Sequence, residues 1–379
     1  RTRVASGPSS TTSGAGRVGL LGAGNFTVQV LLPAIKAAGA TLDTVVSSGG
    51  TSASLAAERF GARQSSSDPA DVFDDPSVDT VVVATRHDSH GPYVERALRA
   101  GKHVFVEKPV VVSAEQLASL EACIDEVTSA GGPVPLLGVG FNRRFAPVTR
   151  RMSELLAGVS GPKAVTLTMN AGAIPADHWT QDPVAGGGRI VGEACHFIDL
   201  ARFLVGAPIV GVDAITLDQP GPRDTVTISL RFADGSIATV NYFANGSKRY
   251  PKERVEVFAG GRVLVNDNFR TLRAYGWPGV RTFRVRSQDK GHAAGMAAFV
   301  AADVRHAVMF LEGRSTDVID ELVKSMEQAS ADLAFENAAE LRDEISRLRQ
   351  MQAKDGSIDL SEFAVDDAVL NLDTDGRLL

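Results

Sequence analysis

Residues 18–27, Val18-Gly-Leu-Leu-Gly-Ala-Gly-Asn-Phe-Thr27, decide the fold of this chain. The apolar run at 18–21 is typical of a buried parallel strand, and it continues directly into a glycine-rich turn. Apolar residues then recur at helical spacing as far as Gly39. A strand, a turn that contains Gly22 and Gly24, and a helix together predict a dinucleotide-binding loop.

The positions of this turn have separate physical roles. Gly22 permits the tight turn, and Gly24 lets the backbone approach a pyrophosphate at the positive end of the helix. Asn25 and Phe26 complete the loop. Thr27 stands where the dinucleotide fingerprint has a third glycine, so the glycine motif by itself is incomplete. The prediction of a dinucleotide-binding loop therefore depends on the position of the motif between a strand and a helix.

Strands and helices continue to alternate over residues 17–137. Further strands are predicted at 42–46, 79–85 and 103–106, and helices at 52–60 and 93–100. Alternation at this spacing predicts an NAD(P)-binding α/β Rossmann domain with a doubly wound parallel sheet.

The pattern changes over residues 138–303. Alternating or β-branched segments, separated by turns such as Ala233-Asp-Gly235, occur at 163–169, 224–232, 237–243, 254–258 and 262–265. They predict an α+β domain with a mostly antiparallel sheet, which serves substrate binding and oligomerisation, and with one helix at 193–203. Such a domain covers the open end of the first sheet and leaves a cleft at the carboxyl ends of its strands, where ligands bind in α/β folds.

The two ends of the chain differ from both domains. Residues 1–16 are rich in Ser, Thr and Gly and predict a flexible linker. Apolar positions at helical spacing predict a C-terminal helical hairpin over 308–352. The acidic tail, 353–379, has a weak pattern and is left unassigned.

Composition narrows the classes of function. The 39 Lys and Arg residues against 45 Asp and Glu residues give a net charge of −6, whereas direct binding of nucleic acid normally needs a basic face. Two cysteines, Cys123 and Cys195, are too few for a disulfide framework, and no metal site is predicted. No apolar run approaches the ~18 residues that cross a bilayer, and the first residues lack the apolar core of a signal peptide. We therefore expect a cytoplasmic protein that does not enter a membrane.

The end of the second predicted strand bears on the choice of cofactor. Dinucleotide-binding folds normally have a carboxylate there for the ribose 2′-hydroxyl, but Val45-Val46 is followed by Ser47-Ser48-Gly-Gly50. A carboxylate would repel a 2′-phosphate, whereas hydroxyl and backbone N–H groups can bind one. The pattern favours NADP over NAD; alternatively, Ser47 and Ser48 only form a turn.

A string near residue 105 is the most specific in the first domain. Residues 100–109, which end in Glu107-Lys108-Pro109, occur in order with Thr85, His90, Gly186-Gly-Gly188 and His196-Phe-Ile-Asp199. With these motifs, residues 17–302 resemble the glucose–fructose oxidoreductase and inositol dehydrogenase (Gfo/Idh/MocA) family, and within it the oxidoreductase half of larger two-part enzymes. The resemblance implies hydride transfer between NAD(P) and a secondary hydroxyl of a sugar, a polyol or a sugar derivative.

The resemblance also implies roles for single residues. Lys108 would lie beside the nicotinamide and the reacting carbinol, where it can orient the hydroxyl and share in proton transfer. His196 would exchange a proton with that hydroxyl, and Asp199, three residues on, could orient the imidazole ring. Further cofactor contacts are implied for Thr85, His90 and Glu107. Oligomeric state stays open, although subunits of this family often pair through the exposed sheet face to form a homo-oligomer.

The chain departs from the family beside the histidine. The family commonly has an Asp four residues before it, and this sequence has Gly192 there, followed by Glu193. Either Glu193 takes over, or the proton relay lacks its carboxylate. Arg143 and Arg144 could bind an anionic group of the substrate, and structural ion pairs are an equal alternative.

Residues 308–352 carry a second resemblance. Phe310-Leu-Glu-Gly-Arg314, Val318-Ile-Asp-Glu-Leu322 and the stretch up to Ile345 resemble the UVR motif region, which occurs in the B and C subunits of the bacterial UvrABC excision nuclease. The residues 310–314 that lead into it are more similar to the C subunit. In that family the motif is a helical hairpin that pairs with a like hairpin on a partner protein. Residues 317–344 hold nine acidic and two basic side chains, which favours a protein partner over DNA. The alternative function is therefore a repair-related interaction module on a non-catalytic nucleotide-binding scaffold.

Overall fold

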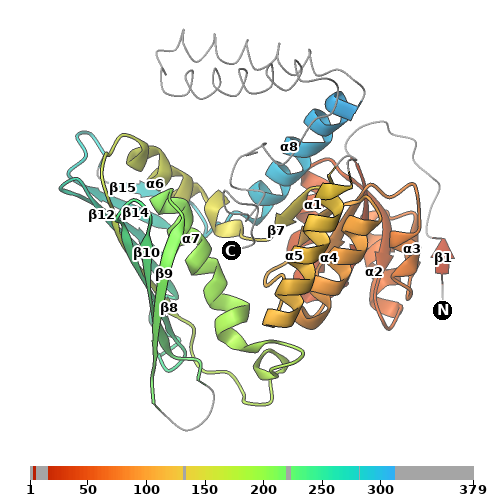
Figure 1. The fold of residues 1–379 in the computed structure, drawn as a ribbon, viewed down its shortest axis with the longest axis horizontal. Coiled ribbons are helices and arrows are strands. Elements are labelled where there is room, and N and C mark those ends of the chain that lie inside the picture. Colours follow the sequence, from red (N-terminus) through yellow and green to blue (C-terminus); the bar gives the residue numbers. More distant parts are fainter. Residues whose placement is uncertain (1–2, 6–15, 131–133, 219–222, 281, 312–379) are drawn as a thin grey trace.

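The structure is a computed structural model that describes residues 3–5, 16–130, 134–218, 223–280 and 282–311. Two sheets, each with its own helices, stand beside each other, and one long helix near the end of the described chain lies at their boundary (Figure 1).

The first sheet has seven strands in the order β1-β4-β3-β2-β5-β6-β7. The bounds are β1 Arg3–Ala5, β2 Arg17–Leu21, β3 Thr41–Val46, β4 Gln64–Ser66, β5 Thr80–Val83, β6 His103–Val106 and β7 Leu137–Val139. The strands from β2 to β7 run parallel to their neighbours. The predicted doubly wound parallel sheet is therefore confirmed.

Helices cover both faces of this sheet. Their bounds are η1 Thr27–Leu31, α1 Leu32–Ala37, α2 Thr51–Phe60, α3 Ala70–Phe73, α4 His90–Arg99 and α5 Ala114–Ser129. Leu20 packs into a core with α1 and α2, while Leu21, its neighbour in β2, packs into a second core with α4 and α5. Successive side chains of a strand point to opposite faces, so a sheet that is buried on both faces needs continuous apolar runs.

The strand β1 was not expected. It lies within residues 1–16, for which the sequence predicts a linker, and it pairs antiparallel with β4. Without β1, the backbone groups along one side of β4 would form an open sheet edge. Pairing of these edge groups is a tertiary effect that the Ser- and Gly-rich composition does not reveal.

The second sheet has eight strands in the order β15-β14-β13-β12-β8-β11-β10-β9. The bounds are β8 Ala164–Asn170, β9 Ile209–Thr216, β10 Val226–Phe232, β11 Ile237–Phe243, β12 Glu253–Ala259, β13 Arg262–Asp267, β14 Thr271–Tyr275 and β15 Thr282–Arg284. Only the pair β8 and β11 is parallel among these strands, so the prediction of a mostly antiparallel sheet is confirmed.

Among the described residues, helices cover one face of the second sheet and leave the other face exposed. The helices α6, Pro147–Ala157, and α7, Cys195–Val205, pack on the covered face and form its core with alternate residues of the strands. The helix predicted at 193–203 begins in the structure as a π-helical turn, η5 Ile190–Ala194, which continues into α7. Apolar side chains that stay exposed on the sheet include Ile237, Phe258 and Tyr275.

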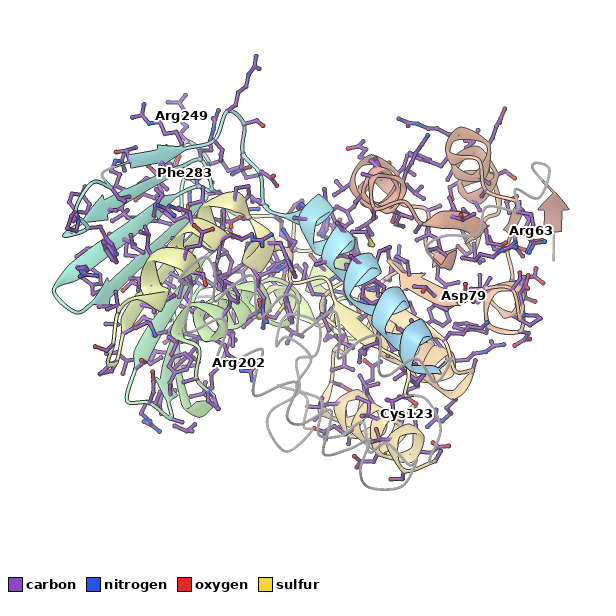
Figure 2. All side chains as sticks on the ribbon, turned by 90° about the horizontal axis from the view of Figure 1, so that it is seen from above. Arg63, Asp79, Cys123, Arg202, Arg249 and Phe283 are labelled. Atoms are coloured by element: carbon purple, nitrogen blue, oxygen red, sulfur yellow. The ribbon has the colours of Figure 1, made fainter. Side chains whose placement is uncertain are left out.

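The helix α8, His292–Leu311, joins the two halves. Its residues Met296 and Phe299 belong to the core of the first sheet, although the sequence places them in the second domain. Figure 2 shows α8 running along the boundary between the two halves. Residues 308–311, predicted as the start of the hairpin, are the end of α8; the rest of the hairpin and the tail 353–379 lie outside the described residues.

No helix in the described ranges is long and apolar enough to cross a membrane. The cysteines Cys123 and Cys195 are free thiols. Within the same ranges, His, Cys, Asp and Glu side chains form no cluster of three or more that could hold a metal ion.

Candidate functional site

The glycine-rich turn after β2 has the geometry of a nucleotide-binding loop. Gly22 has φ +99° and its N–H donates to the carbonyl of Val46 at 2.9 Å. A Cβ at Gly22 would lie 2.3 Å from the Ala84 carbonyl oxygen, so only glycine fits there. A Cβ at Gly24 would meet nothing within 4 Å, so the backbone is open to a ligand. Asn25 is exposed, Phe26 is 41% exposed, and Thr27 is buried where the fingerprint has its third glycine.

The end of β3 contains the two serines that the sequence connects with the ribose. Ser47 Oγ accepts hydrogen bonds from Ala53 N–H at 3.1 Å and from Ser52 Oγ at 2.9 Å, and so it supports the start of α2. The turn role that the sequence left open for Ser47 is therefore present. Ser48 is exposed beside it.

Lys108 reaches from the first half of the molecule to the second. It follows β6, and its Nζ donates a hydrogen bond to the Gly192 carbonyl oxygen at 2.7 Å. Gly192 lies in η5, the turn that leads into α7 and His196. The structure therefore brings Lys108 to the turn that precedes the helix of His196.

Both ring nitrogens of His90 contact backbone carbonyl oxygens of the chain. Its Nδ1 lies 2.7 Å from the Pro109 carbonyl oxygen and its Nε2 lies 3.2 Å from the Thr85 carbonyl oxygen. Burial lowers its pKa, so it carries one proton, which the shorter contact places on Nδ1. The ring, 1% exposed, ties the loop after β5 to the loop after β6, and the cofactor contact implied for His90 stays a prediction. Thr85 Oγ1 pairs with Ser89 Oγ at 2.7 Å in the same loop.

Glu107, next to Lys108, is a half-buried carboxyl group. Burial raises its pKa to about 7, against the opposing effect of the Lys108 charge. A Cβ at Gly140, the residue after β7, would lie 2.9 Å from Glu107 Oε1. Because Gly140 has no side chain, the Glu107 carboxyl group fits beside it. Glu107 lines a small cavity with Phe141, Asn142 and His292.

His196 is buried in the second half, close to the same loop. It is 6% exposed, and burial followed by the charges of Arg143 and Lys108 holds its pKa well below the ordinary value. Its Nδ1 is buried and has no hydrogen-bond partner in the described part of the chain. His196 is therefore neutral at physiological pH and has hydrogen-bonding capacity that the described residues do not use.

Asp199 does not orient the His196 ring. Its carboxylate accepts hydrogen bonds from Arg144 Nε at 2.8 and 2.9 Å and from Arg144 Nη2 at 2.5 Å. The predicted role for Asp199 is therefore not the one this structure displays. Asp199 lies on the same helix as His196, three residues further on. Its carboxylate binds the Arg144 guanidinium of η3, Asn142–Phe145, because a carboxylate and a guanidinium form a stronger, charged pair.

The two arginines are bound in ion pairs, which was one of the two alternatives. Arg143 donates to both Glu253 oxygens at 2.9 and 3.0 Å, and Lys290 Nζ lies 2.5 Å from Glu253 Oε1. Arg143 is 6% and Arg144 3% exposed. The expectation that either arginine binds a substrate anion is thus not supported, because buried carboxylates of this chain already occupy their donors.

Glu193 also has partners inside the protein. Tyr242 Oη donates to Glu193 Oε2 at 2.7 Å, and Arg189 Nε donates to Oε1 at 3.3 Å. Burial raises the pKa of Glu193, but the Tyr242 hydrogen bond and the Arg189 charge outweigh it and lower the pKa overall. The Glu193 carboxylate therefore accepts hydrogen bonds from Tyr242 and Arg189, and Lys108 donates to the backbone carbonyl of Gly192.

Sequence reasoning missed two histidines at the boundary of the halves. His292, at the start of α8, packs its ring against Phe26 of the glycine-rich loop at 5.6 Å. His87 lies between Thr85 and His90, inside the quoted motif, and contacts residues of the second half. The position of His87 within that motif was a signal in the sequence. His292 is 266 residues from Phe26 in the chain (292 − 26), and only the packing of α8 brings the two rings together.

Comparisons with known proteins found three family models that match parts of this chain. A model described as "Oxidoreductase family, NAD-binding Rossmann fold" matches residues 16–130, one described as "GFO/IDH/MocA C-terminal domain" matches 161–261, and the "UvrB/uvrC motif" matches 316–350. Inositol 2-dehydrogenase 2 of Saccharopolyspora erythraea is 34% identical over 253 residues, which are 63% of this chain and 70% of that protein. Inositol 2-dehydrogenase of Rhizobium meliloti is 29% identical over 304 residues, which are 76% of this chain and 88% of that protein.

Solved structures share the fold. Levoglucosan dehydrogenase in complex with NADH and levoglucosan superposes with a TM-score of 0.66 at 22% identity, over 76% of this chain and 89% of that one. An oxidoreductase domain protein from Kribbella flavida gives a TM-score of 0.67 at 20% identity, over 77% of this chain and 90% of that one.

Proposed function

This chain belongs to the Gfo/Idh/MocA oxidoreductase family, and we propose that it transfers a hydride between NAD(P) and a secondary hydroxyl of a sugar, a polyol or a sugar derivative. The observation that carries the proposal is the hydrogen bond from Lys108 to the Gly192 carbonyl. It joins the carboxyl end of β6, where α/β folds bind their ligands, to the turn that leads into His196.

The residues of the first half fit a dinucleotide. The open face of Gly24 and the tight turn at Gly22 suit the approach of a pyrophosphate to the start of a helix. Asn25, Phe26, Ser47, Ser48 and Thr85 are the other residues that would hold the cofactor. A bound nicotinamide supplies the hydride acceptor in oxidation and the hydride donor in reduction.

Lys108 and His196 supply the acid–base chemistry in this proposal. His196 is kept neutral, so its imidazole takes the proton of the substrate hydroxyl in oxidation and returns it in reduction. Lys108 Nζ exchanges the Gly192 carbonyl for the substrate oxygen, orients it, and stabilises the negative charge that develops there. In oxidation the carbon of the substrate therefore loses a hydride to the nicotinamide, and its oxygen loses a proton to His196.

Turnover in the presence of polyols tests the proposed function. We expect the chain to reduce NADP or NAD, followed at 340 nm, with at least one of myo-inositol, levoglucosan and D-xylose. These compounds are chosen because proteins similar to this chain are a myo-inositol dehydrogenase, a levoglucosan dehydrogenase and a D-xylose dehydrogenase. Saturable binding of NADPH or NADH without turnover on any of the three would favour the non-catalytic nucleotide-binding scaffold.

The exposed Ser48 and the absence of a carboxylate after β3 support a preference for NADP. We expect NADPH to bind more tightly than NADH in a fluorescence titration. Ser48→Asp should weaken NADPH binding at least about tenfold and leave NADH binding nearly unchanged, because a carboxylate repels the 2′-phosphate. Ser119→Asp, on the exposed side of α5, is the matched control. An equal effect of Ser48→Asp on both cofactors would contradict the preference.

The segment at 316–350 supports a protein partner as an additional role. We propose that it pairs with a protein that carries the same motif, because its nine acidic side chains oppose contact with phosphates. Mixing the full-length chain with a bacterial UvrB protein and following the mass by light scattering should show a complex. The complex should be absent after truncation at residue 311, and a complex that persists in the truncated chain would refute the assignment to this segment.

A further inference from the structure

The turn that presents the Gly192 carbonyl to Lys108 is held from its other side by the second sheet. Glu193, the next residue of η5, has a bond at each of its carboxylate oxygens. Tyr242 Oη donates to Oε2 at 2.7 Å, and Arg189 Nε donates to Oε1 at 3.3 Å. Two successive residues of one turn therefore link Lys108, in the first half of the molecule, to β11 of the second sheet.

The two donors to Glu193 are themselves fixed in place. Tyr242 is fully buried, and Arg189 is 3% exposed. Arg189 Nη1 also donates to the Gly172 carbonyl oxygen at 2.8 Å, and its guanidinium lies over the Tyr242 ring, 5.4 Å from the centroid. Side chains that are packed and bonded in this way keep one rotamer. They therefore hold the Glu193 carboxylate in one position relative to the sheet.

Glu193 is ionised when it makes these bonds. Burial raises its pKa, but the Tyr242 hydrogen bond and the Arg189 charge prevail and lower it. A carboxylate only accepts, so it can bind both donors at once, and a hydrogen bond to an ionised group is about twice as strong as one between neutral groups. The anchor that the three side chains form is therefore intact at physiological pH.

This anchor limits the direction in which the Gly192 carbonyl points. The carbonyl group of Gly192 and the Cα of Glu193 belong to one planar peptide unit, so fixing residue 193 restricts the orientation of that unit. Glycine has no side chain that could do so, and it permits more backbone conformations than other residues. The π-helical form of η5 is rare in proteins, and single π-helical turns are frequent at functional sites.

We propose that Glu193 is a positioning residue: bound to Tyr242 and Arg189, it directs the Gly192 carbonyl at Lys108 and thereby holds Lys108 Nζ where the reacting oxygen binds. This inference rests on the proposed function. Glu193 acts without contact to the substrate, through the backbone and the hydrogen bond to Lys108. Loss of the anchor leaves Lys108 present but displaced, and a displacement of about 1 Å can cost about 100-fold in rate.

Tyr242→Phe tests this role, because it removes one hydrogen bond of Glu193 and keeps the buried ring. With whichever of myo-inositol, levoglucosan and D-xylose the wild-type chain oxidises, kcat should fall about 10- to 100-fold, and the Kd for NADPH should change less than about twofold. In the Lys108→Met background the same substitution should change the remaining rate less than about twofold, because the residue through which it acts is gone. Tyr275→Phe, at a tyrosine that is 55% exposed, is the matched control.

Labelling of lysine amino groups by acetic anhydride gives a readout that needs no turnover. Peptide mass spectrometry of the full chain reports the rate at each lysine. Lys108 should react about fivefold faster in Tyr242→Phe than in the wild-type chain, which is the equivalent of one lost hydrogen bond. Lys36, an exposed residue of α1, should react at an unchanged rate.

Failure of the proposed function and failure of this inference give different results. Faster labelling of Lys108 in a chain that oxidises none of the three compounds upholds the anchoring by Glu193 and overturns the proposed hydride transfer. Unchanged labelling of Lys108, an equal loss of rate in the wild-type and Lys108→Met backgrounds, or a loss of NADPH affinity as large as the loss of kcat overturns the role of Glu193.

Discussion

Replacement of Lys108 by alanine is expected to lower kcat by about 10²–10⁴-fold, the range for removal of a positioned acid–base group. Lys108 Nζ is held at the junction of the two halves by one hydrogen bond to a backbone carbonyl. A substrate oxygen can replace that carbonyl, whereas alanine offers no donor and leaves the developing alkoxide unstabilised. The glycine-rich loop after β2 is a separate element, so the Kd for NADPH should change by less than about threefold, or under 1 kcal/mol.

Two controls make the Lys108 result specific. Lys108→Met keeps most of the side-chain volume but has no charge or donor, and it should lose kcat as the alanine variant does. Lys36→Ala removes an exposed lysine of α1 and should leave kcat unchanged. A Lys108→Ala protein with wild-type kcat, or one that no longer binds NADPH, would rule out Lys108 as the group that acts on the substrate hydroxyl.

Replacement of Glu253 by alanine is expected to destabilise the fold by about 3–5 kcal/mol. The Glu253 side chain is fully buried between Arg143 and Lys290, whose side chains, taken without the backbone, are 8% and 19% exposed. Without the carboxylate, the two cations face each other in a poorly hydrated site. Urea unfolding of the full chain measures the loss, and Glu154→Ala, which breaks the exposed pair with Arg151, should cost less than about 1 kcal/mol. Equal losses in the two variants would contradict the buried network.

The same carboxylate makes stability depend on pH. Burial raises the pKa of Glu253, but the charges and hydrogen bonds of Arg143 and Lys290 prevail and lower it from 4.5 to about 2. The folded-state pKa is depressed, so this contribution is complete above pH 4.5 and is lost as the pH falls towards 2. Its size is about 3 kcal/mol. Glu253→Gln should therefore flatten the decrease in unfolding free energy between pH 5 and pH 3 relative to the wild-type chain.

The local elements around the glycine-rich turn and the strands next to it in the sheet were predictable from the sequence, whereas α5, Ala114–Ser129, and α6, Pro147–Ala157, were not predicted. The run at 18–21, the glycines at 22 and 24 and the following apolar spacing each predict an element from fewer than about 15 neighbouring residues, because strand and helix periodicities are local. The element order then determines the parallel sheet, since strands that alternate with helices pack in this way. The motif around Lys108 and its expected place at the carboxyl end of a strand follow from the same local information.

Only the tertiary structure decided which side chains meet. The partners of Glu193, Arg143 and Asp199 are 49, 110 and 55 residues away in the chain, and no periodicity connects them. Ionic groups that leave water need a partner with matching geometry. The packing of η3 against α7 and β12 gives each of the two arginines a carboxylate partner within the protein. The contact of Lys108 with Gly192, and the room that Gly192 leaves for His87, likewise exist because the two domains pack against each other, and the free energy of that packing is distributed over surfaces that are far apart in the sequence.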